Sequence, residues 1–227
     1  MPTEHPSTQN NEQLILSNLY CIGRNYAQHA KELGNTVPSE PVVFLKTLGA
    51  LGPHCGDFKL FCPTSDETPQ HELELVLYIE KGGFQIPEEK ALTHLGGFAL
   101  GLDLTLRKKQ RTLSEAGKPW ALAKSFYNSA LVGPIVQTTV DEALLTSLSY
   151  SLEVNGSIRQ VGSPNEMIFH PKTLISFISQ VVPLQKGDLI FTGTPSGVGA
   201  IQPGDSLTAK LKTERLKGPY EVSWRAL

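Results

Sequence analysis

The chain has 227 residues, of which 40% are hydrophobic and 19% charged, and its formal net charge is −2. A chain of this length buries a large core as one domain or at most two. The near-neutral charge gives no reason to expect nucleic acid or an anionic membrane surface as a partner, and no apolar run reaches membrane-spanning length. We therefore expect neither nucleic acid nor a membrane among its partners.

The first dozen residues, MPTEHPSTQNNE, are polar and lack the basic start and the apolar segment of a secretory signal. We expect a flexible polar tail over residues 1–12 and a single domain over residues 13–227. The three cysteines, Cys21, Cys55 and Cys62, match neither an even disulfide framework nor a zinc motif. Reduced, buried thiols are expected, which predicts a cytoplasmic protein.

A helix is predicted over residues 25–33, in the stretch CIGRNYAQHAKELGN. His29 and Glu32 are three residues apart and are therefore neighbours on its surface. A histidine beside a carboxylate can act as a general base, because the carboxylate stabilises the imidazolium. The alternative is an ordinary surface ion pair. With Gly23 before it and Gly34 after it, this short helix is a candidate for a mobile lid.

The stretch QHELELVLYIEK, residues 70–81, is apolar enough to be a buried strand but carries Glu72 and Glu74. Residues two apart in a strand share one face, so these carboxylates point the same way, roughly 7 Å apart. Like charges that are close and half buried repel each other and lose hydration, which a bound cation would offset. The alternative is that both glutamates face solvent on an amphipathic strand.

A third carboxylate, Asp103, ends the apolar, Gly-rich part of GGFALGLDLTLRKKQ, residues 96–110. Strand ends are where ligands are usually presented. Three carboxylates without a neighbouring His or Cys favour a hard cation, and Mg²⁺ or Mn²⁺ keeping several waters fits best. The sequence therefore predicts a metal site built from Glu72, Glu74 and Asp103.

Two further segments could contribute to such a site. Lys124 stands among small and apolar residues in WALAKSFYNSALVGP, either as an ordinary snorkelling side chain or as a positive charge at a buried anion. The stretch FTGTPSGVGAIQPGD is a strand that runs into a loop with Gly193, Gly197 and Gly199, and Thr194 adds a hydroxyl. Such loops let backbone N–H groups approach an anion, although a plain turn has the same pattern.

Most of the chain is predicted to be strands. Short apolar runs bounded by turn signals lie at residues 42–46, 73–79, 96–104, 130–136, 148–154, 188–192 and 206–211. Residues 148–160 alternate around Asn155-Gly156, which predicts a β-hairpin with a type I′ turn. Further helices are predicted near 105–116 and over 172–182. The expected fold class is α+β, β-rich, with a few helices around the strands.

Six short segments, in this order, resemble the fumarylacetoacetate hydrolase family: CIGRNYAQHAKE, EPVVFLK, HELELVLYI, LDLTLRKKQ, KPWALAKSF and FTGTPSGVG. The resemblance runs from about Leu14 to the C-terminus. It is strongest to the short single-domain members of the acylpyruvase and oxaloacetate decarboxylase type. It implies the mixed β-sandwich roll of the family's C-terminal domain, usually as a homodimer, with residues 13–227 as one catalytic domain.

The resemblance also implies roles for individual residues. Metal ligands would be Glu72, Glu74 and Asp103, which would hold Mg²⁺ or Mn²⁺, and Ca²⁺ could occupy the same site. Catalytic residues would be His29, Glu32 and Lys124. Substrate contacts would come from Arg24, Arg107, Gln110, Gly193 and Thr194. The chain departs from the family pattern at Lys108 and Tyr127, where members usually or often carry Asp.

The activity implied first is metal-dependent hydrolysis of the C–C bond of a small acylpyruvate, such as acetylpyruvate or fumarylpyruvate, through a metal-stabilised enolate. His29, oriented by Glu32, would activate the attacking water. The alternative is an oxaloacetate decarboxylase or an oxaloacetate keto–enol tautomerase that uses the same site, since both need the enolate but not that water. A more remote alternative is a non-catalytic metal-binding scaffold.

Overall fold

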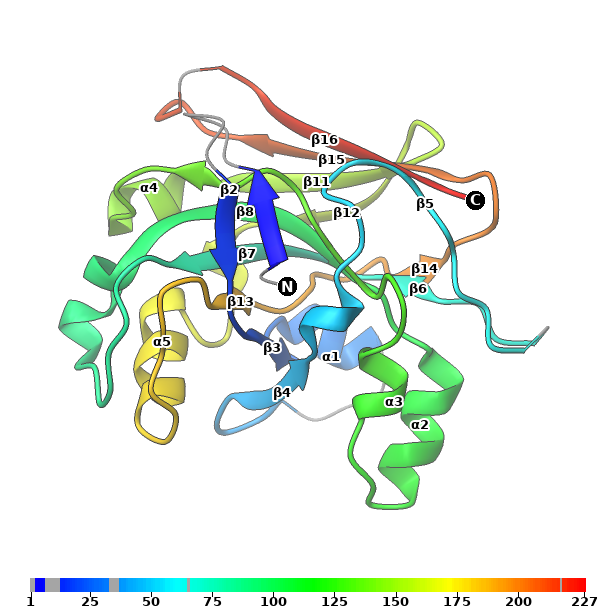
Figure 1. Cartoon of the computed structure of the whole chain (residues 1–227), viewed down its shortest axis with the longest axis horizontal. Coiled ribbons are helices and arrows are strands. Elements are labelled where there is room, and N and C mark those ends of the chain that lie inside the picture. Colours follow the sequence, from blue (N-terminus) through cyan, green and yellow to red (C-terminus); the bar gives the residue numbers. More distant parts are fainter. Residues whose placement is uncertain (1–2, 7–12, 33–36, 65, 217) are drawn as a thin grey trace.

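A computed structural model describes residues 3–6, 13–32, 37–64, 66–216 and 218–227, and the side chains of residues 3–6, 13 and 29–31 fall outside that description. Two layers of β-sheet form the body of the molecule, and the helices lie around their edges (Figure 1). The α+β, β-rich fold that the sequence predicts is confirmed. That residues 13–227 form one catalytic domain stays a prediction.

The larger sheet has seven strands and carries the candidate site. Its order is β10 (Val136–Gln137), β8 (Leu95–Asp103), β7 (Leu73–Ile79), β13 (Leu189–Phe191), β3 (Leu19–Gly23) and β4 (Val42–Lys46), with β9 (Ala130–Val132) also paired to β8. All pairs are antiparallel except β13 with β3. Every residue of β7 is buried, which explains its continuous apolar run.

The second sheet has five strands in the order β12 (Ser157–Gly162), β11 (Ser149–Val154), β15 (Ser206–Lys212), β16 (Tyr220–Ala226) and β5 (Gly56–Phe58). Asn155 and Gly156 join β11 to β12 with φ angles of 52° and 75°, as a type I′ turn requires, so the predicted hairpin is confirmed. Burial alternates along β16, because one face covers the core and the other meets solvent.

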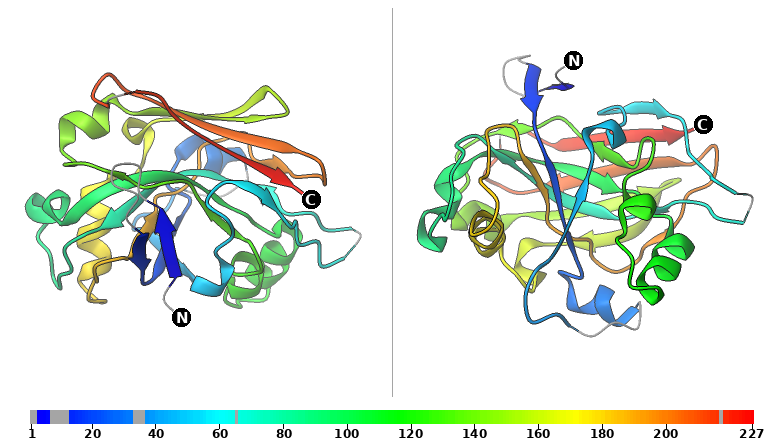
Figure 2. Two further views of the ribbon diagram at one scale, coloured as in Figure 1. Left: turned by 45° about the horizontal axis from the view of Figure 1, so that its top comes forward. Right: turned by 60° about the horizontal axis from the view of Figure 1, so that its bottom comes forward.

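The main core lies between the two sheets. Leu75, Phe98 and Leu100 from the larger sheet belong to one buried cluster with Tyr150 and Trp224 from the second sheet. All five side chains are essentially inaccessible to solvent, and burial of each contributes roughly 1.5–3 kcal/mol. This packing holds β7 and β8 rigidly, and these are the strands that carry the acidic residues. The views in Figure 2 show the two sheets as stacked layers.

Strands β6 (Gln70–His71) and β14 (Gly199–Ala200) form a separate two-stranded sheet. The described part of the fold also has five helices and three short 3₁₀ segments. They are α1 (Ala27–Glu32), α2 (Arg107–Glu115), α3 (Ala121–Lys124), α4 (Glu142–Ser147), α5 (Pro171–Ser179), η1 (Leu48–Ala50), η2 (Glu88–His94) and η3 (Pro164–Glu166). The three predicted helices correspond to α1, α2 and α5. Helices α2 and α3 lie side by side at one end of the larger sheet (Figure 1).

Within the segment expected to be a tail, β1 (Thr3–Pro6) pairs with β2 (Gln13–Leu16), while residues 1–2 and 7–12 lie outside the described residues, so the flexible tail stays a prediction. The prediction of buried thiols is right for Cys21 but wrong for Cys55 and Cys62, which are exposed because they lie in turn segments on either side of β5. Within the described part of the chain, no helix is long and apolar enough to span a membrane.

Candidate active site

The antiparallel pairing of β7 with β8 brings the three predicted carboxylates together. Glu74 lies in β7, Glu72 directly precedes Leu73 at its start, and Asp103 ends β8, where its N–H donates to the carbonyl of Glu72 at 2.9 Å. One oxygen from each carboxylate lies within 4.8 Å of the other two. The residues are 4%, 1% and 1% exposed for Glu72, Glu74 and Asp103, so the solvent-facing alternative is wrong.

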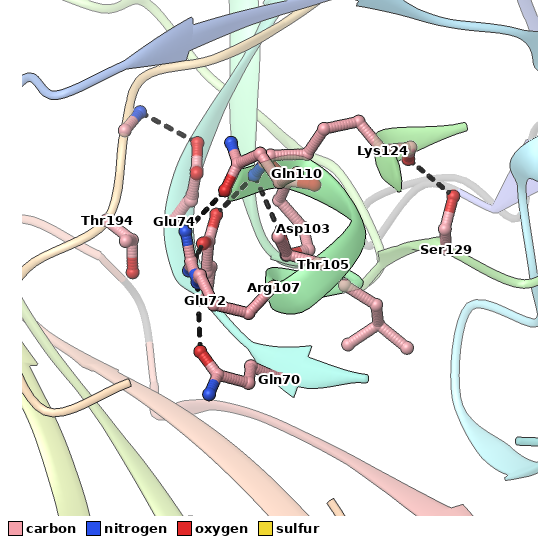
Figure 3. Close-up of polar contacts among 12 residues, drawn as sticks. Gln70, Glu72, Glu74, Asp103, Thr105, Arg107, Gln110, Lys124, Ser129 and Thr194 are labelled. Carbon is pink, nitrogen blue, oxygen red and sulfur yellow. Dashed lines mark hydrogen bonds and ion pairs between the residues drawn. The ribbon is translucent and has the colours of Figure 1, made fainter. Parts of the chain in front are cut away.

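Three cations balance these three negative charges. The Nζ of Lys124, at the end of α3, lies 2.6 Å from Glu72 Oε2 and 2.7 Å from Asp103 Oδ2. The Nζ of Lys46, at the end of β4, lies 2.8 Å from Asp103 Oδ1, and the Arg107 guanidinium pairs with Glu72 Oε1. Lys124 is therefore a buried charge at buried anions, and its side chain does not snorkel to solvent. Figure 3 shows Lys124 and Arg107 beside the three carboxylates.

The two lysines respond differently to burial. Burial acts to lower the pKa of Lys124, but the charges of Asp103 and Glu72 outweigh it, so the pKa is raised and the side chain stays an ammonium. Burial lowers the pKa of Lys46 despite the attraction of Asp103. Lys46 Nζ also donates to the carbonyls of Ser129 at 2.9 Å and of Lys124. Lys46 thus fixes the backbone beside Asp103 and Lys124, a role that the sequence reasoning missed.

Glu74 has a different environment from the other two carboxylates. Burial, together with the charges of Asp103 and Glu72, raises its pKa well above the usual range. Its Oε2 accepts one hydrogen bond, at 2.7 Å, from the backbone N–H of Gly193. Gly193 has φ +96°, and a Cβ there would lie 2.7 Å from Asn25 Cβ, so only glycine fits. The loop amide therefore binds the protein's own carboxylate, and a substrate contact by Gly193 stays a prediction.

The carboxylate cluster fits a hard divalent cation. Its donors are three carboxylate oxygens close enough to share one ion, and no His or Cys belongs to the described group. The raised pKa of Glu74 reflects burial first and then the negative charges of Asp103 and Glu72, and a cation would relieve that repulsion. Glu72, Glu74 and Asp103 are thus the residues that would hold the metal.

A cavity of about 290 Å³ opens beside this cluster. Its wall includes Glu72, Glu74, Lys124 and Thr194, and also Arg24, Phe44, Arg107, Gln110, Arg111, Ser114, Glu115 and Trp120. Arg107 and Gln110 are joined, since Arg107 Nη1 donates to Gln110 Oε1 at 2.7 Å, and Arg107 Nε donates to Gln70 Oε1 at 3.0 Å. Four of the five predicted substrate contacts therefore line one cavity, and Gly193 is the exception.

The predicted dyad on α1 is only partly visible. Glu32 is exposed, and its carboxylate accepts from the backbone N–H of Gly197 at 3.3 Å, which links the end of α1 to the Gly-rich loop. The side chain of His29 lies outside the described residues, as does Gly34. Lys108, which replaces the usual family Asp, pairs with Asp66 on the surface at 3.2 Å. The water-activating role of His29 and Glu32 stays a prediction.

The sequence reasoning also missed Gln160, which lies in β12 and is 1% exposed. Its Oε1 accepts from Leu73 N–H at 3.0 Å and lies 2.9 Å from Nδ1 of His71. Its Nε2 donates to Thr194 Oγ1 at 2.8 Å and to the carbonyl of Pro195 at 2.9 Å. Gln160 thus ties the strand that carries the glutamates to the loop that carries Thr194. The sequence carries no signal for this role, because a glutamine between Arg159 and Val161 in a hairpin is ordinary.

The fold and the site define a class of protein: β-sandwich enzymes with a buried carboxylate triad beside a cationic cavity. Residues 18–218 match the family described as fumarylacetoacetate (FAA) hydrolase C-terminal. The match covers most of the chain, and the chain belongs to this family, as the six sequence segments indicated. The mixed β-sandwich roll expected from the resemblance is confirmed.

Relatives of known name come from several organisms. The mouse protein named oxaloacetate tautomerase FAHD1, mitochondrial, is 42% identical over 193 residues, which are 85% of this chain and 86% of the relative. A rice protein, oxaloacetate tautomerase FAHD2, mitochondrial, is 40% identical over 83% of both chains. The crystal structure of fumarylpyruvate hydrolase from Pseudomonas aeruginosa, in complex with Mn²⁺ and pyruvate, is 34% identical with a TM-score of 0.89, covering 100% of this chain and 96% of that one.

Proposed function

We propose that the protein interconverts the keto and enol forms of oxaloacetate, and that the same site binds other small 2-keto acids. One observation carries this proposal. The Lys124 ammonium lies at the cavity wall and donates its three N–H groups to Glu72, Asp103 and Thr105, so it can stabilise negative charge on a bound oxygen through its positive charge. Keto–enol exchange requires stabilisation of an enolate and movement of one proton at C3. The names of the mouse and rice relatives support the choice of oxaloacetate.

The metal that we propose is Mg²⁺ or Mn²⁺, held by Glu72, Glu74 and Asp103, with Ca²⁺ as a substitute. A divalent cation bound there supplies a Lewis acid for the keto oxygen and carboxylate of the substrate. The Mn²⁺ and pyruvate of the Pseudomonas aeruginosa structure support this choice, because pyruvate is itself a 2-keto acid.

The chain's own residues then have distinct tasks. Lys124 remains protonated, so it contributes charge and does not serve as the base. Lys46 holds Asp103 and the Lys124 carbonyl in place from behind. Arg107 and Gln110 form one connected donor surface on α2, suited to a substrate carboxylate. Phe44 and Trp120 cover the cavity with apolar surface, which restricts water around the developing enolate.

Hydrolysis of an acylpyruvate is the second candidate, and decarboxylation of oxaloacetate is a third outcome of the same enolate chemistry. Hydrolysis is favoured by the contact between Glu32 and Gly197, which sets α1 against the loop that carries Thr194. His29 would then activate the water, with Glu32 stabilising its charged form. The name of the Pseudomonas aeruginosa protein supports this activity. A non-catalytic scaffold is not favoured, since the family consists of enzymes and the described site residues are complete.

We further propose that the protein is a homodimer in the cytoplasm. The exposed apolar side chains of Val43 and Leu45 on the edge strand β4 and of Ile15 on β2 support self-association, because an edge strand with apolar side chains favours pairing. The cytoplasmic location stays a prediction, and the mouse and rice relatives are named mitochondrial.

A substrate panel separates the candidate reactions. Purified protein with Mg²⁺ is given oxaloacetate, fumarylpyruvate or acetylpyruvate, and NMR follows the enol, the keto form and the products. We expect fast exchange of oxaloacetate, and at least a roughly hundredfold loss of any hydrolysis in His29→Ala with little loss of exchange. Lys124→Met should impair every reaction. Oxaloacetate exchange no faster than the buffer rate would contradict the proposal.

A further inference from the structure

Two arginines in the cavity wall, Arg24 and Arg111, form no ion pair with Glu72, Glu74 or Asp103. Four cationic side chains line its wall: Arg24, Arg107, Arg111 and Lys124. Arg107 and Lys124 are paired with Glu72 and Asp103. Among the described residues, no carboxylate oxygen lies within 4.0 Å of the guanidinium of Arg24 or Arg111, although Glu115 lies on the outer wall. Their charge is therefore available to a ligand.

Arg111 lies on the same face of helix α2 as Arg107, and both line the cavity. Arg107, Gln110, Arg111 and Ser114 follow the spacing that puts side chains on one face of a helix, and all four line the cavity. Arg111 is one turn after Arg107, about 6 Å further along the axis of α2. A substrate whose 2-keto acid head lies by Lys124 and Arg107 would extend its other end along this face towards Arg111.

Arg24 lines the same cavity from the segment between β3 and α1. It has φ +60°, a left-handed conformation that is costly for a residue with a side chain and that persists only where the surroundings enforce it. Its guanidinium carbon lies 6.0 Å from the centre of the Trp120 ring, within the range of a cation–π contact. Trp120 Nε1 donates to Ser114 Oγ at 2.7 Å, so the ring that supports Arg24 is itself fixed to α2.

We propose that Arg24 and Arg111 bind the second carboxylate of the substrate and make the enzyme selective for dianionic 2-keto acids over monoanionic ones. The inference rests on the proposed function and adds the residues that recognise the far end of the substrate. Arginine suits this role, because its planar donors match a carboxylate in pairs. Arg107 and Lys124 recognise the head that all 2-keto acids share, and Arg24 and Arg111, which have no carboxylate partner among the described residues, distinguish the tail.

Two substrates with the same head test the inference: oxaloacetate and its 4-ethyl monoester, which lacks the second negative charge. For wild-type protein we expect kcat/KM to be at least about tenfold higher for oxaloacetate. Arg111→Gln and Arg24→Gln should each lower that ratio severalfold, mainly through KM for oxaloacetate, and the double variant should bring it close to one. Arg111→Lys should retain part of the preference, because it keeps the charge.

Lys109→Gln is the matched control. It removes a positive charge from the same helix, but Lys109 is exposed and does not line the cavity, so the substrate ratio should stay at the wild-type value. Equal losses for both substrates in the arginine variants would overturn the inference, since the arginines would then only shape the wall. If wild type converted neither substrate, the proposed function would fail. Calorimetric binding of the two compounds would still decide whether the arginines discriminate charge.

Discussion

Asp103 and Glu74 are neighbours in one acidic cluster, yet the protein compensates their charges differently. Asp103 lies between the ammonium groups of Lys46 and Lys124, at 2.8 and 2.7 Å. Glu74 has a backbone amide as its hydrogen-bond donor and a raised pKa. Removal of either carboxylate takes away a proposed metal ligand, but the consequences for folding differ because only the removal of Asp103 leaves a buried cation without its carboxylate.

We predict that Asp103→Ala lowers the free energy of unfolding by about 3–5 kcal/mol, since it leaves the buried Lys46 ammonium without its carboxylate and leaves Lys124 with Glu72 alone. Glu74→Gln should change it by less than about 1 kcal/mol or increase it, because the amide relieves repulsion and keeps an acceptor for Gly193. Urea unfolding with EDTA present measures both values. Equal destabilisation by the two changes would contradict this charge balance.

The residues that can be predicted from sequence are those whose chemistry is visible locally. Two glutamates in an apolar strand are costly without a cation, so their spacing alone makes Glu72 and Glu74 candidate metal ligands. Lys46 and Gln160 gave no comparable signal, because a lysine at the end of a strand and a glutamine in a hairpin are ordinary. Their roles depend on contacts with residues 57 and 34 positions away, Asp103 and Thr194, and these contacts exist only in the folded sheet pair.

At the level of elements, Gln160 links the two sheets at the site. All four of its hydrogen-bonding positions are used, so no shorter or apolar side chain can replace it. We predict that Gln160→Leu lowers kcat/KM for oxaloacetate by about tenfold or more, because Thr194 and the start of β7 lose their common partner.

Leu152→Ala, in the neighbouring strand β11, is the control for stability. Leu152 is fully buried in the core between the sheets, so its truncation should cost about 2–5 kcal/mol and leave KM unchanged. Steady-state kinetics and urea unfolding are measured on both variants. A Gln160→Leu protein that loses stability but keeps the wild-type KM would show that this glutamine supports the fold and does not position the site.

His170, directly before α5, predicts how stability depends on pH. Burial lowers its pKa below the ordinary value of 6.5, and the positive charge of Lys172 lowers it further. The carboxylates of Glu142, 3.4 Å away, and of Glu88 act to raise the pKa but do not outweigh burial. Its Nδ1 is buried without a hydrogen-bond partner among the described residues. Between the lowered pKa and 6.5 the unfolded chain binds the proton first, so this histidine's contribution to stability is lost as the pH falls through that range.

We therefore predict that the melting temperature falls between about pH 7 and pH 5, and that His170→Gln reduces this fall. Differential scanning calorimetry of both proteins in EDTA measures the difference. A variant whose melting temperature changes with pH as steeply as that of the wild type would remove His170 as a contributor.

The elements themselves were largely predictable. Alternation around Asn155-Gly156 identified the hairpin, and the apolar runs identified β7, β8 and β15 within one or two residues. Strand β16 was missed because its polar and apolar residues alternate without a continuous apolar run, and α3 because it spans only four residues. The order of strands in each sheet was not predictable, since it depends on pairing between distant segments such as β13 with β3.

Considered as a whole, the molecule is a stack of two sheets that holds three carboxylates and three cations at one end of the larger sheet. At full ionisation these six groups would carry three negative and three positive charges, and the raised pKa of Glu74 shows that its carboxylate is the least compensated of the three. The charges of a divalent cation and a dianionic 2-keto acid cancel, so the two can enter together without adding uncompensated buried charge. The central claim is that this cluster binds one metal ion that is required for turnover.

The most direct test is a titration of chelator-treated protein with Mn²⁺. Bound Mn²⁺ is counted by electron paramagnetic resonance, and the same samples are assayed for ketonisation of enol-oxaloacetate. We predict that activity is absent without metal, rises in proportion to bound Mn²⁺ and reaches its maximum at one ion per chain. Glu74→Gln should bind Mn²⁺ at least about tenfold more weakly, because it removes a charged ligand. Full activity in metal-free protein, or activity that does not follow the bound metal, would contradict the account.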